Sequence, residues 1–288
     1  MAKAKSTAVA QVLEFDAEAI RSNEMKVAKE SDSEIIDRLK ERFQILTDMT
    51  RAVKKGDVRA MIVSGPPGVG KSFGVEEVLS KDDLFDTLGN RKPKYEVVKG
   101  AMSALGLYAK LYEFSDAKNV IVFDDCDSVL MDDLSLNILK GALDSSSKRT
   151  IAWNTDSRML RSEGIPDKFE FKGAAIFITN IKFEHVKSKR LRDHLDALES
   201  RCHYIDLQMD TQREKVLRIK QIVGDGMLDA HDFDHPEIAK DEILEFINTN
   251  KDRLRELSLR MVLKLADLRK SFPATWQAMA KTTCMRRI

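Results

Sequence analysis

"VSGPPGVGKSF", residues 63–73, puts three glycines and two prolines between an apolar run and a lysine–serine pair. The pattern G-x-x-x-x-G-K-[ST] is met in full by four of these residues: Gly65, Gly70, Lys71 and Ser72. Glycine has no Cβ atom, so the backbone N–H groups of such a loop can approach an anion closely where a helix begins. The stretch predicts a phosphate-binding loop in which Lys71 reaches the β- and γ-phosphates of a nucleotide and the Ser72 hydroxyl ligates Mg²⁺.

The flanks of the loop supply the strand–loop–helix context that this pattern requires. Residues 60–63 are an apolar run that predicts a buried strand, and residues 73–79 predict a helix. A chance turn rich in glycine and proline is the alternative, and it leaves both flanks unexplained. The residues expected to surround the phosphates are Gly65, Pro66, Pro67, Gly68, Val69, Gly70, Lys71, Ser72 and Phe73.

The composition is that of a globular protein without a strong charge bias. The 288 residues are 43% hydrophobic and 33% charged, and Lys plus Arg (48) nearly cancel Asp plus Glu (47). The overall charge therefore argues neither for nor against a nucleic-acid partner. No apolar run approaches the ~20 residues that span a membrane, and no secretory signal is evident. Cys126, Cys202 and Cys284 are too few and too scattered for a disulfide framework, so we expect a cytoplasmic protein without membrane contact.

Strand and helix patterns alternate along the first two thirds of the chain. An amphipathic helix is predicted from about residue 32 to 53. The predicted main strands are residues 60–63, 95–100, 120–123, 174–180 and 203–207. This alternation implies a parallel sheet with helices on both faces. Residues 149–153 and 169–173 predict a hairpin or two short strands between the third and fourth main strands.

The pattern changes after residue 210, where no further strand is evident. Helices are predicted over residues 211–223, 241–248 and 254–272, with a loop between the first two. We therefore predict three parts: a flexible N-terminal arm (1–31), an α/β nucleotide-binding core (32–209) and a helical domain with a basic tail (210–288).

Two acids directly follow the third predicted strand. In an open α/β sheet, ligands lie beyond the carboxyl ends of the strands. Asp124 is therefore expected to hold Mg²⁺, directly or through water, and Asp125 to polarise the attacking water. The alternative is that both acids merely cap a strand end in solvent.

With these residues in place, the chain resembles the AAA+ ATPases, the ring-forming branch of the P-loop NTPases, over residues 32–272. In style it resembles the minimal single-module members found in phages. The resemblance implies an α/β fold in which a P-loop core with a five-stranded parallel sheet precedes a small all-helical lid. It also implies ATP and Mg²⁺ as ligands and a homo-oligomeric ring, expected to be a hexamer. The family usually has Glu where this chain has the shorter Asp125, which keeps a nucleotide-dependent scaffold with little turnover as an alternative.

Three more positions match functional residues of that family. Asn180, at the end of "FITN", resembles the sensor 1 residue that orients water near the γ-phosphate. Arg201, in a Ser-Arg-Cys stretch, resembles the arginine finger that acts on a neighbouring subunit's nucleotide, with Arg190 and Arg192 as second candidates. Arg260 resembles sensor 2, which reaches from the lid to the γ-phosphate of its own subunit. The expected catalytic residues are Lys71, Asp125, Asn180 and Arg201.

The substrate is less evident from the sequence. The loop over residues 99–104 lacks the aromatic residue that usually grips a polypeptide, although Lys99 and Met102 are candidates to line a pore. The alternative is an ordinary strand–helix connection. In a longer insert, residues 145–173, six basic residues with Trp153 and Phe169 interleaved suit a nucleic-acid backbone and its bases. These are Lys148, Arg149, Trp153, Arg158, Arg161, Lys168, Phe169 and Lys172.

The expected function is an ATPase that works on single- or double-stranded DNA, in replication, helicase loading or a clamp-loader-like role. A protein remodeller that acts on a polypeptide partner is the alternative, and Trp153 is then a core residue. The stretch "HDFDH" (231–235) offers two His and two Asp as candidate metal ligands, but an ordinary polar loop explains it better because no further ligand is apparent.

Overall fold

The computed structural model describes residue 27 and residues 29–88, 93–183 and 186–287. They form two compact units. The α/β unit contains residues 42–66 and 70–208, and the helical unit contains residues up to 41, residues 67–69 and the chain from 209 onward. Most of the predicted N-terminal arm, residues 1–26 and 28, lies outside the described residues.

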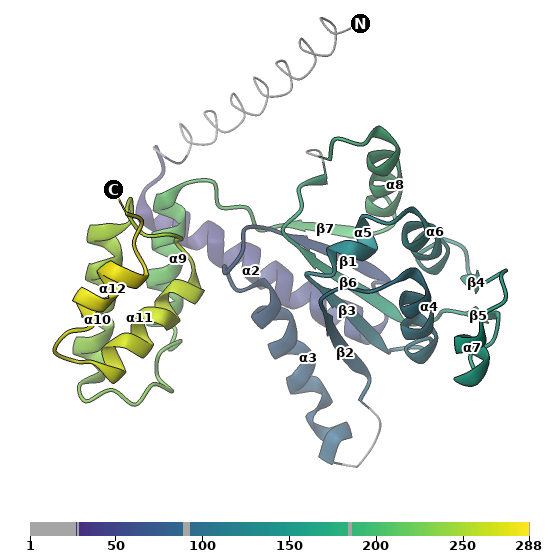
Figure 1. The fold of residues 1–288 in the computed structure, drawn as a ribbon, viewed down its shortest axis with the longest axis horizontal. Coiled ribbons are helices and arrows are strands. Elements are labelled where there is room, and N and C mark those ends of the chain that lie inside the picture. The colour runs from purple at the N-terminus through teal and green to yellow at the C-terminus, as the bar shows by residue number, and fades with distance from the viewer. Residues whose placement is uncertain (1–26, 28, 89–92, 184–185, 288) are drawn as a thin grey trace, which may run out of the picture. The chain divides into compact units, whose positions relative to one another are not determined.

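The α/β unit is built on a five-stranded sheet in the order β2-β3-β6-β1-β7, and every neighbouring pair is parallel. Figure 1 shows the five strands side by side. They are β1 (Ala60–Ser64), β2 (Tyr95–Lys99), β3 (Val120–Asp124), β6 (Ala174–Thr179) and β7 (His203–Asp206). The predicted five-stranded parallel sheet is confirmed. Every residue of β1, β3 and β6 is buried, as expected for strands covered on both faces.

Helices cover both faces of this sheet because alternate strand residues point to opposite sides. On one face, Ile62, Phe123 and Phe177 pack against α4 (Ala104–Glu113), α6 (Asp133–Ala142) and α8 (Lys189–Glu199). On the other face, the neighbouring residues Val63, Val122 and Ile176 pack against α3 (Lys71–Leu88) and the later part of α2 (Asp32–Lys55). Ser103, Asp132 and Ser188 cap α4, α6 and α8 by accepting hydrogen bonds from backbone N–H groups.

The insert between β3 and β6 has its own small sheet. The strands β4 (Thr150–Ala152) and β5 (Lys168–Glu170) pair antiparallel, which confirms the predicted pair of short strands. Between them lies α7 (Arg158–Ser162), which was not predicted. Its N-cap is Ser157, whose side chain accepts from the backbone N–H of Leu160.

The helical unit contains α9 (Gln212–Gly224), α10 (Pro236–Asn250), α11 (Leu259–Ser271) and α12 (Trp276–Thr283). The first three were predicted, with two corrected starts. Proline at the first position of α10 begins that helix five residues earlier than predicted, because Pro fits where no N–H partner is needed. Ser258 caps α11, whose start lies five residues later than predicted, since Leu254 pairs with Met285 in an isolated bridge.

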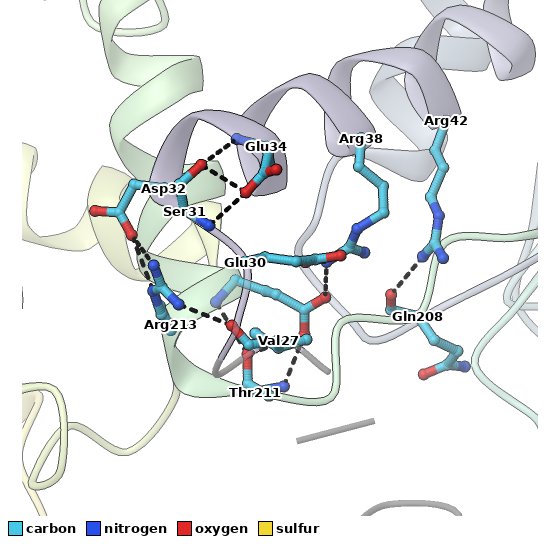
Figure 2. A network of polar contacts seen from close by, with 11 residues as sticks. Val27, Glu30, Ser31, Asp32, Glu34, Arg38, Arg42, Gln208, Thr211 and Arg213 are labelled. Carbon is cyan, nitrogen blue, oxygen red and sulfur yellow. Dashed lines mark hydrogen bonds and ion pairs between the residues drawn. The ribbon is translucent and has the colours of Figure 1, made fainter. Parts of the chain in front are cut away.

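The N-terminal part of the helical unit is fixed to the start of α9 by charged hydrogen bonds (Figure 2). Arg213 donates to the carbonyl oxygen of Val27 at 2.8 Å and forms an ion pair with Asp32 at 2.5 Å. Arg38 pairs with the buried carboxylate of Glu214 at 3.2 Å. The last residues of the predicted arm therefore contact α9 directly. No helix within the described ranges is both long and apolar enough to cross a membrane.

Candidate functional site

The strand order brings the predicted residues of the α/β unit to one edge of the sheet. The glycine-rich loop leaves β1 at Ser64 and enters α3 at Lys71. Because β6 lies between β1 and β3, Asn180 at the end of β6 stands between that loop and the acids that end β3. Within the α/β unit the loop contributes Gly65, Pro66 and the residues from Gly70 onward, whereas residues 67–69 belong to the helical unit.

The ammonium group of Lys71 is the centre of this arrangement. Lys71 is only 6% exposed. Its Nζ atom lies 2.7 Å from the carbonyl oxygen of Gly65, 2.9 Å from that of Pro66 and 2.7 Å from Oδ1 of Asn180. These three acceptors orient the ammonium. A buried cation held in this way is suited to binding an anion.

Ser72 and Asp124 form the adjoining pair. The Ser72 hydroxyl donates to Oδ1 of Asp124 at 2.8 Å, and Asp124 is only 5% exposed. A hydroxyl and a carboxylate are hard oxygen ligands, and Mg²⁺ binds through one or two such protein groups together with waters and phosphate oxygens. The pair therefore fits the metal role predicted for it.

Asp125 and Asn180 extend the network on the other side of Lys71. The Asn180 amide donates through Nδ2 to Oδ1 of Asp125 at 3.0 Å, while its Oδ1 accepts from Lys71. Asp125 has φ +52°, a left-handed conformation that Asp tolerates better than most residues. Its backbone N–H donates to Ile178 O at 3.0 Å, which holds this turn against β6. Asn180 thus connects the ammonium and the exposed carboxylate.

Several contacts at this site were not predicted. The buried Thr179 hydroxyl donates to Oδ1 of Asp127 at 2.8 Å and accepts from the backbone N–H of Ile181 at 3.0 Å, so it supports the backbone on both sides of Asn180. Lys99 forms an ion pair with Glu76 at 2.7 Å, and that hydrogen bond raises the pKa of Lys99. Because Thr179 directly precedes Asn180 in "FITN", its supporting role could have been predicted from the sequence.

Cys126 follows the two acids but has the character of a packing group. It is buried, and its thiol donates to Val98 O at 3.2 Å. Burial raises the pKa of the Cys126 thiol, so the neutral form persists at physiological pH. The thiol is therefore poorly suited to act as a nucleophile.

The three arginines near β7 contact groups outside the Lys71 network. Arg201 donates through Nη1 to Ala197 O at 2.5 Å, and its Nε lies 4.0 Å from Oδ1 of Asp144. That Nε is buried and has no hydrogen-bond partner within the described residues. Arg192 donates to Val186 O at 2.6 Å, and Arg190 pairs with Asp133 at 2.8 Å. In the single chain, the predicted finger therefore contacts the preceding helix α8.

Arg260 lies at the start of α11. That helix and residues 67–69 of the glycine-rich loop belong to the same helical unit. The backbone N–H of Leu259 donates to Gly68 O at 2.7 Å. Gly68 has φ +71°, and a Cβ atom there would stand 2.7 Å from Cβ of Ser258 and 3.6 Å from Cγ of Arg260. The glycine is therefore required for this close approach, a reason that the sequence pattern did not give.

Some of the insert residues that were predicted to bind a substrate instead make packing contacts within the α/β unit. Trp153 is half-buried, with its ring centroid 5.7 Å from that of Tyr108, and Phe169 stands edge-on to Tyr108 at 5.0 Å. Arg149 is buried and donates to Ala142 O and Gly173 O. The prediction that Trp153 stacks on bases is not favoured by this packing, and the core alternative fits it.

In the stretch 231–235, the ring of His231 stacks on that of Phe233, and Asp234 accepts from Arg269 at 3.4 Å. Across the described ranges there is no group of three His, Cys, Asp or Glu side chains that could hold a metal ion.

No protein-family model matches the chain. A relative from Enterobacteria phage T4, described as an uncharacterized 36.7 kDa protein in the nrdC-mobD intergenic region, is 32% identical over 255 residues. The match covers 88% of this chain and 76% of the relative. Since that description states no activity, the geometry of the site carries the functional argument.

Proposed function

The chain belongs to the family of the phage T4 36.7 kDa protein, and we propose that it is an ATPase of the AAA+ type that uses Mg²⁺. One observation carries the proposal. The Lys71 ammonium is held by Gly65 O, Pro66 O and Asn180 Oδ1 beside the Ser72–Asp124 pair, at the carboxyl edge of a parallel sheet. The fold fits an α/β NTPase-like core, and the relative is a phage protein, in keeping with the phage-type resemblance.

Each residue of the network then has a chemical role. Backbone N–H groups of the loop bind the β- and γ-phosphates, and Lys71 neutralises charge on them. Ser72 and Asp124 hold Mg²⁺, which supplies further charge neutralisation when it is bound. Asp125 orients the attacking water and accepts its proton as the bond between the γ-phosphorus and the bridging oxygen breaks, while Asn180 fixes the carboxylate of Asp125.

ATP hydrolysis by the Lys71→Ala variant tests this function. We expect the rate of phosphate release to fall by about 100-fold or more, because a charged group aimed at the transferred phosphoryl is lost. Lys81→Ala is the matched control, since Lys81 lies on the same helix and forms an ion pair with the nearby Glu77 on the surface. A folded Lys71→Ala protein that hydrolyses ATP at the wild-type rate would refute the assignment.

We propose DNA as the substrate of a homo-oligomeric ring. Lys148, Lys168 and Lys172 of the insert are exposed and suit a phosphate backbone. The test is the ATPase rate with and without single-stranded DNA at two salt concentrations. Stimulation that weakens as salt rises supports DNA, because backbone contacts release counterions.

A polypeptide partner is the second candidate, and the insert favours it. Trp153 and Phe169 of the insert pack on Tyr108, and an open cavity of about 870 Å³ lies between α4 and α7. Three acids, Glu113, Asp116 and Glu163, line this cavity with one lysine, Lys110, which pairs with Glu113, so acids outnumber bases in the lining. An acidic lining repels a nucleic acid. An ATPase rate that is unaffected by DNA of any length would favour this partner.

A further inference from the structure

The ammonium group of Lys99 lies close to the carboxylate of Asp124, which is a Mg²⁺ ligand in the proposed function. Lys99 ends β2, and in the register of the two strands its partner on β3 is Asp124. Its Nζ atom lies 3.5 Å from Oδ2 of Asp124 and 2.7 Å from Oε1 of Glu76. The other oxygen of Asp124 accepts from Ser72 at 2.8 Å. Both oxygens of the buried carboxylate therefore have a partner within the chain.

Glu76 is the nearer of the two partners of the Lys99 ammonium, at 2.7 Å against 3.5 Å for Asp124. Glu76 lies four residues after Ser72 on α3, and therefore on the same face of that helix. The Lys99 side chain is 59% exposed, so it is not confined by packing. A divalent cation on Asp124 would repel the ammonium at this distance. Glu76 offers a carboxylate that the ammonium keeps when it moves away.

The loop after β2 is attached to the same acidic end of β3 at a second point. The backbone N–H of Met102 donates to the Ser128 hydroxyl at 3.1 Å, and that hydroxyl lies 3.3 Å from Met102 O. Ser128 belongs to α5 (Asp127–Leu130), which follows the acids directly. A movement of Lys99 away from Asp124 would therefore shift one end of the loop over residues 100–103, while the contact between Met102 and Ser128 holds its other end.

We propose that Lys99 is a positioning residue whose ammonium lies between Glu76 and Asp124 when no divalent cation is bound and keeps only the Glu76 contact when one binds. This inference rests on the proposed function. It makes Lys99 a competitor of Mg²⁺, and it links metal loading at Asp124 to the position of the loop over residues 100–103. Glu76 favours Mg²⁺ binding in this proposal, because its ion pair with Lys99 holds the ammonium away from the metal.

The test measures Mg²⁺ affinity rather than turnover. The fluorescent analogue mant-ADP is bound to the full chain at fixed concentration, and its fluorescence is followed during a Mg²⁺ titration. For Lys99→Met, and for a second variant Lys99→Gln, we expect the half-saturating Mg²⁺ concentration to fall by about threefold to tenfold, as one exposed repulsive charge is removed. Lys81→Met removes a surface lysine from a comparable pair with Glu77 and should leave the titration unchanged.

Glu76→Gln gives the opposite expectation. The half-saturating Mg²⁺ concentration should rise by about threefold, because the ammonium then rests on Asp124 alone. In the Lys99→Met background the same change should have much less effect, since the two residues act through each other. An unchanged or weaker Mg²⁺ affinity in both Lys99 variants, with folding shown by circular dichroism, overturns the inference alone. A wild type that binds no mant-ADP with or without Mg²⁺ removes the proposed function as well.

Discussion

Asn180 joins the two charged groups of the candidate site, because its amide contacts both Lys71 and Asp125. An amide is neutral and has both a donor and an acceptor, so it can hold an ammonium and a carboxylate in fixed positions. Neither group alone explains why an asparagine directly follows β6. The sequence predicted a role for this residue beside the phosphate, and the structure adds the contact with each partner.

Asn180→Ala should separate binding from chemistry. We expect nucleotide affinity within about threefold of the wild type, because Lys71 and the loop remain, and a rate of hydrolysis lower by about 100-fold. Asn180→Asp should also weaken binding, since it adds negative charge beside the phosphates. Binding is measured with mant-ATP and turnover by phosphate release. Wild-type turnover in Asn180→Ala would show that the amide has no catalytic role.

Gly68 is a second residue whose identity is fixed by geometry. Gly68→Ala should lower the free energy of unfolding by about 1–3 kcal/mol, because φ is +71° and the new Cβ would press on Ser258. Gly224→Ala is the control, since a Cβ there meets no atom within 4 Å. Urea unfolding checks both variants. Equal stability of the two would argue against the close approach of Ser258 to Gly68.

At the scale of elements, the sequence predicted what depends on local pattern. The strands β1, β3 and β6 are continuous apolar runs, so their presence was evident from the sequence. The helix α8 was missed because it is highly charged and buries only two residues, Leu195 and Leu198. The helix α12 likewise offers a weak signal, since its cap makes no side-chain hydrogen bond.

Contacts between elements could not be predicted in the same way. Lys99 meets Asp124 only because β2 and β3 share a particular register, and Thr179 meets Asp127 across two strand ends. The burial of Arg149 also depends on packing, because its guanidinium donates to the carbonyl oxygens of Ala142 and Gly173, which lie before and after the two short strands of the insert.

Arg149→Ala tests whether the base of the insert is structural. We expect the free energy of unfolding to fall by about 2–3 kcal/mol, because the change leaves the carbonyls of Ala142 and Gly173 without these donors. Lys148→Ala, at the exposed neighbouring position, should stay within about 0.5 kcal/mol of the wild type. Guanidinium unfolding provides the comparison. An Arg149→Ala protein as stable as the control would return this arginine to the candidates for DNA binding.

At the scale of the whole molecule, the predicted arginine finger, Arg201, does not contact the Lys71 network of its own chain among the described contacts. Arg201 donates to Ala197 of the preceding helix α8, so its role in the proposal requires a neighbouring subunit. We expect Arg201→Ala to bind nucleotide normally and to hydrolyse it more slowly by on the order of 10³-fold. Arg51→Ala, which breaks only an exposed ion pair with Asp48, should hydrolyse ATP normally.

Mixing two inactive variants examines the same point directly. Arg201→Ala subunits retain Asp125, and Asp125→Asn subunits retain the finger, so some interfaces of a mixed ring contain both groups. We expect part of the ATPase activity to return in proportion to such interfaces. If both variants assemble and the mixture stays inactive, Arg201 does not act across an interface.

The central claim is that a nucleotide triphosphate lies in the loop between β1 and α3. The most direct measurement is a crystal or cryo-EM map of the protein with a non-hydrolysable ATP analogue and Mg²⁺. The account predicts phosphate density within hydrogen-bond reach of Lys71 Nζ and metal density at Ser72 Oγ and Asp124. Analogue density at any other place, with this loop empty, would contradict it.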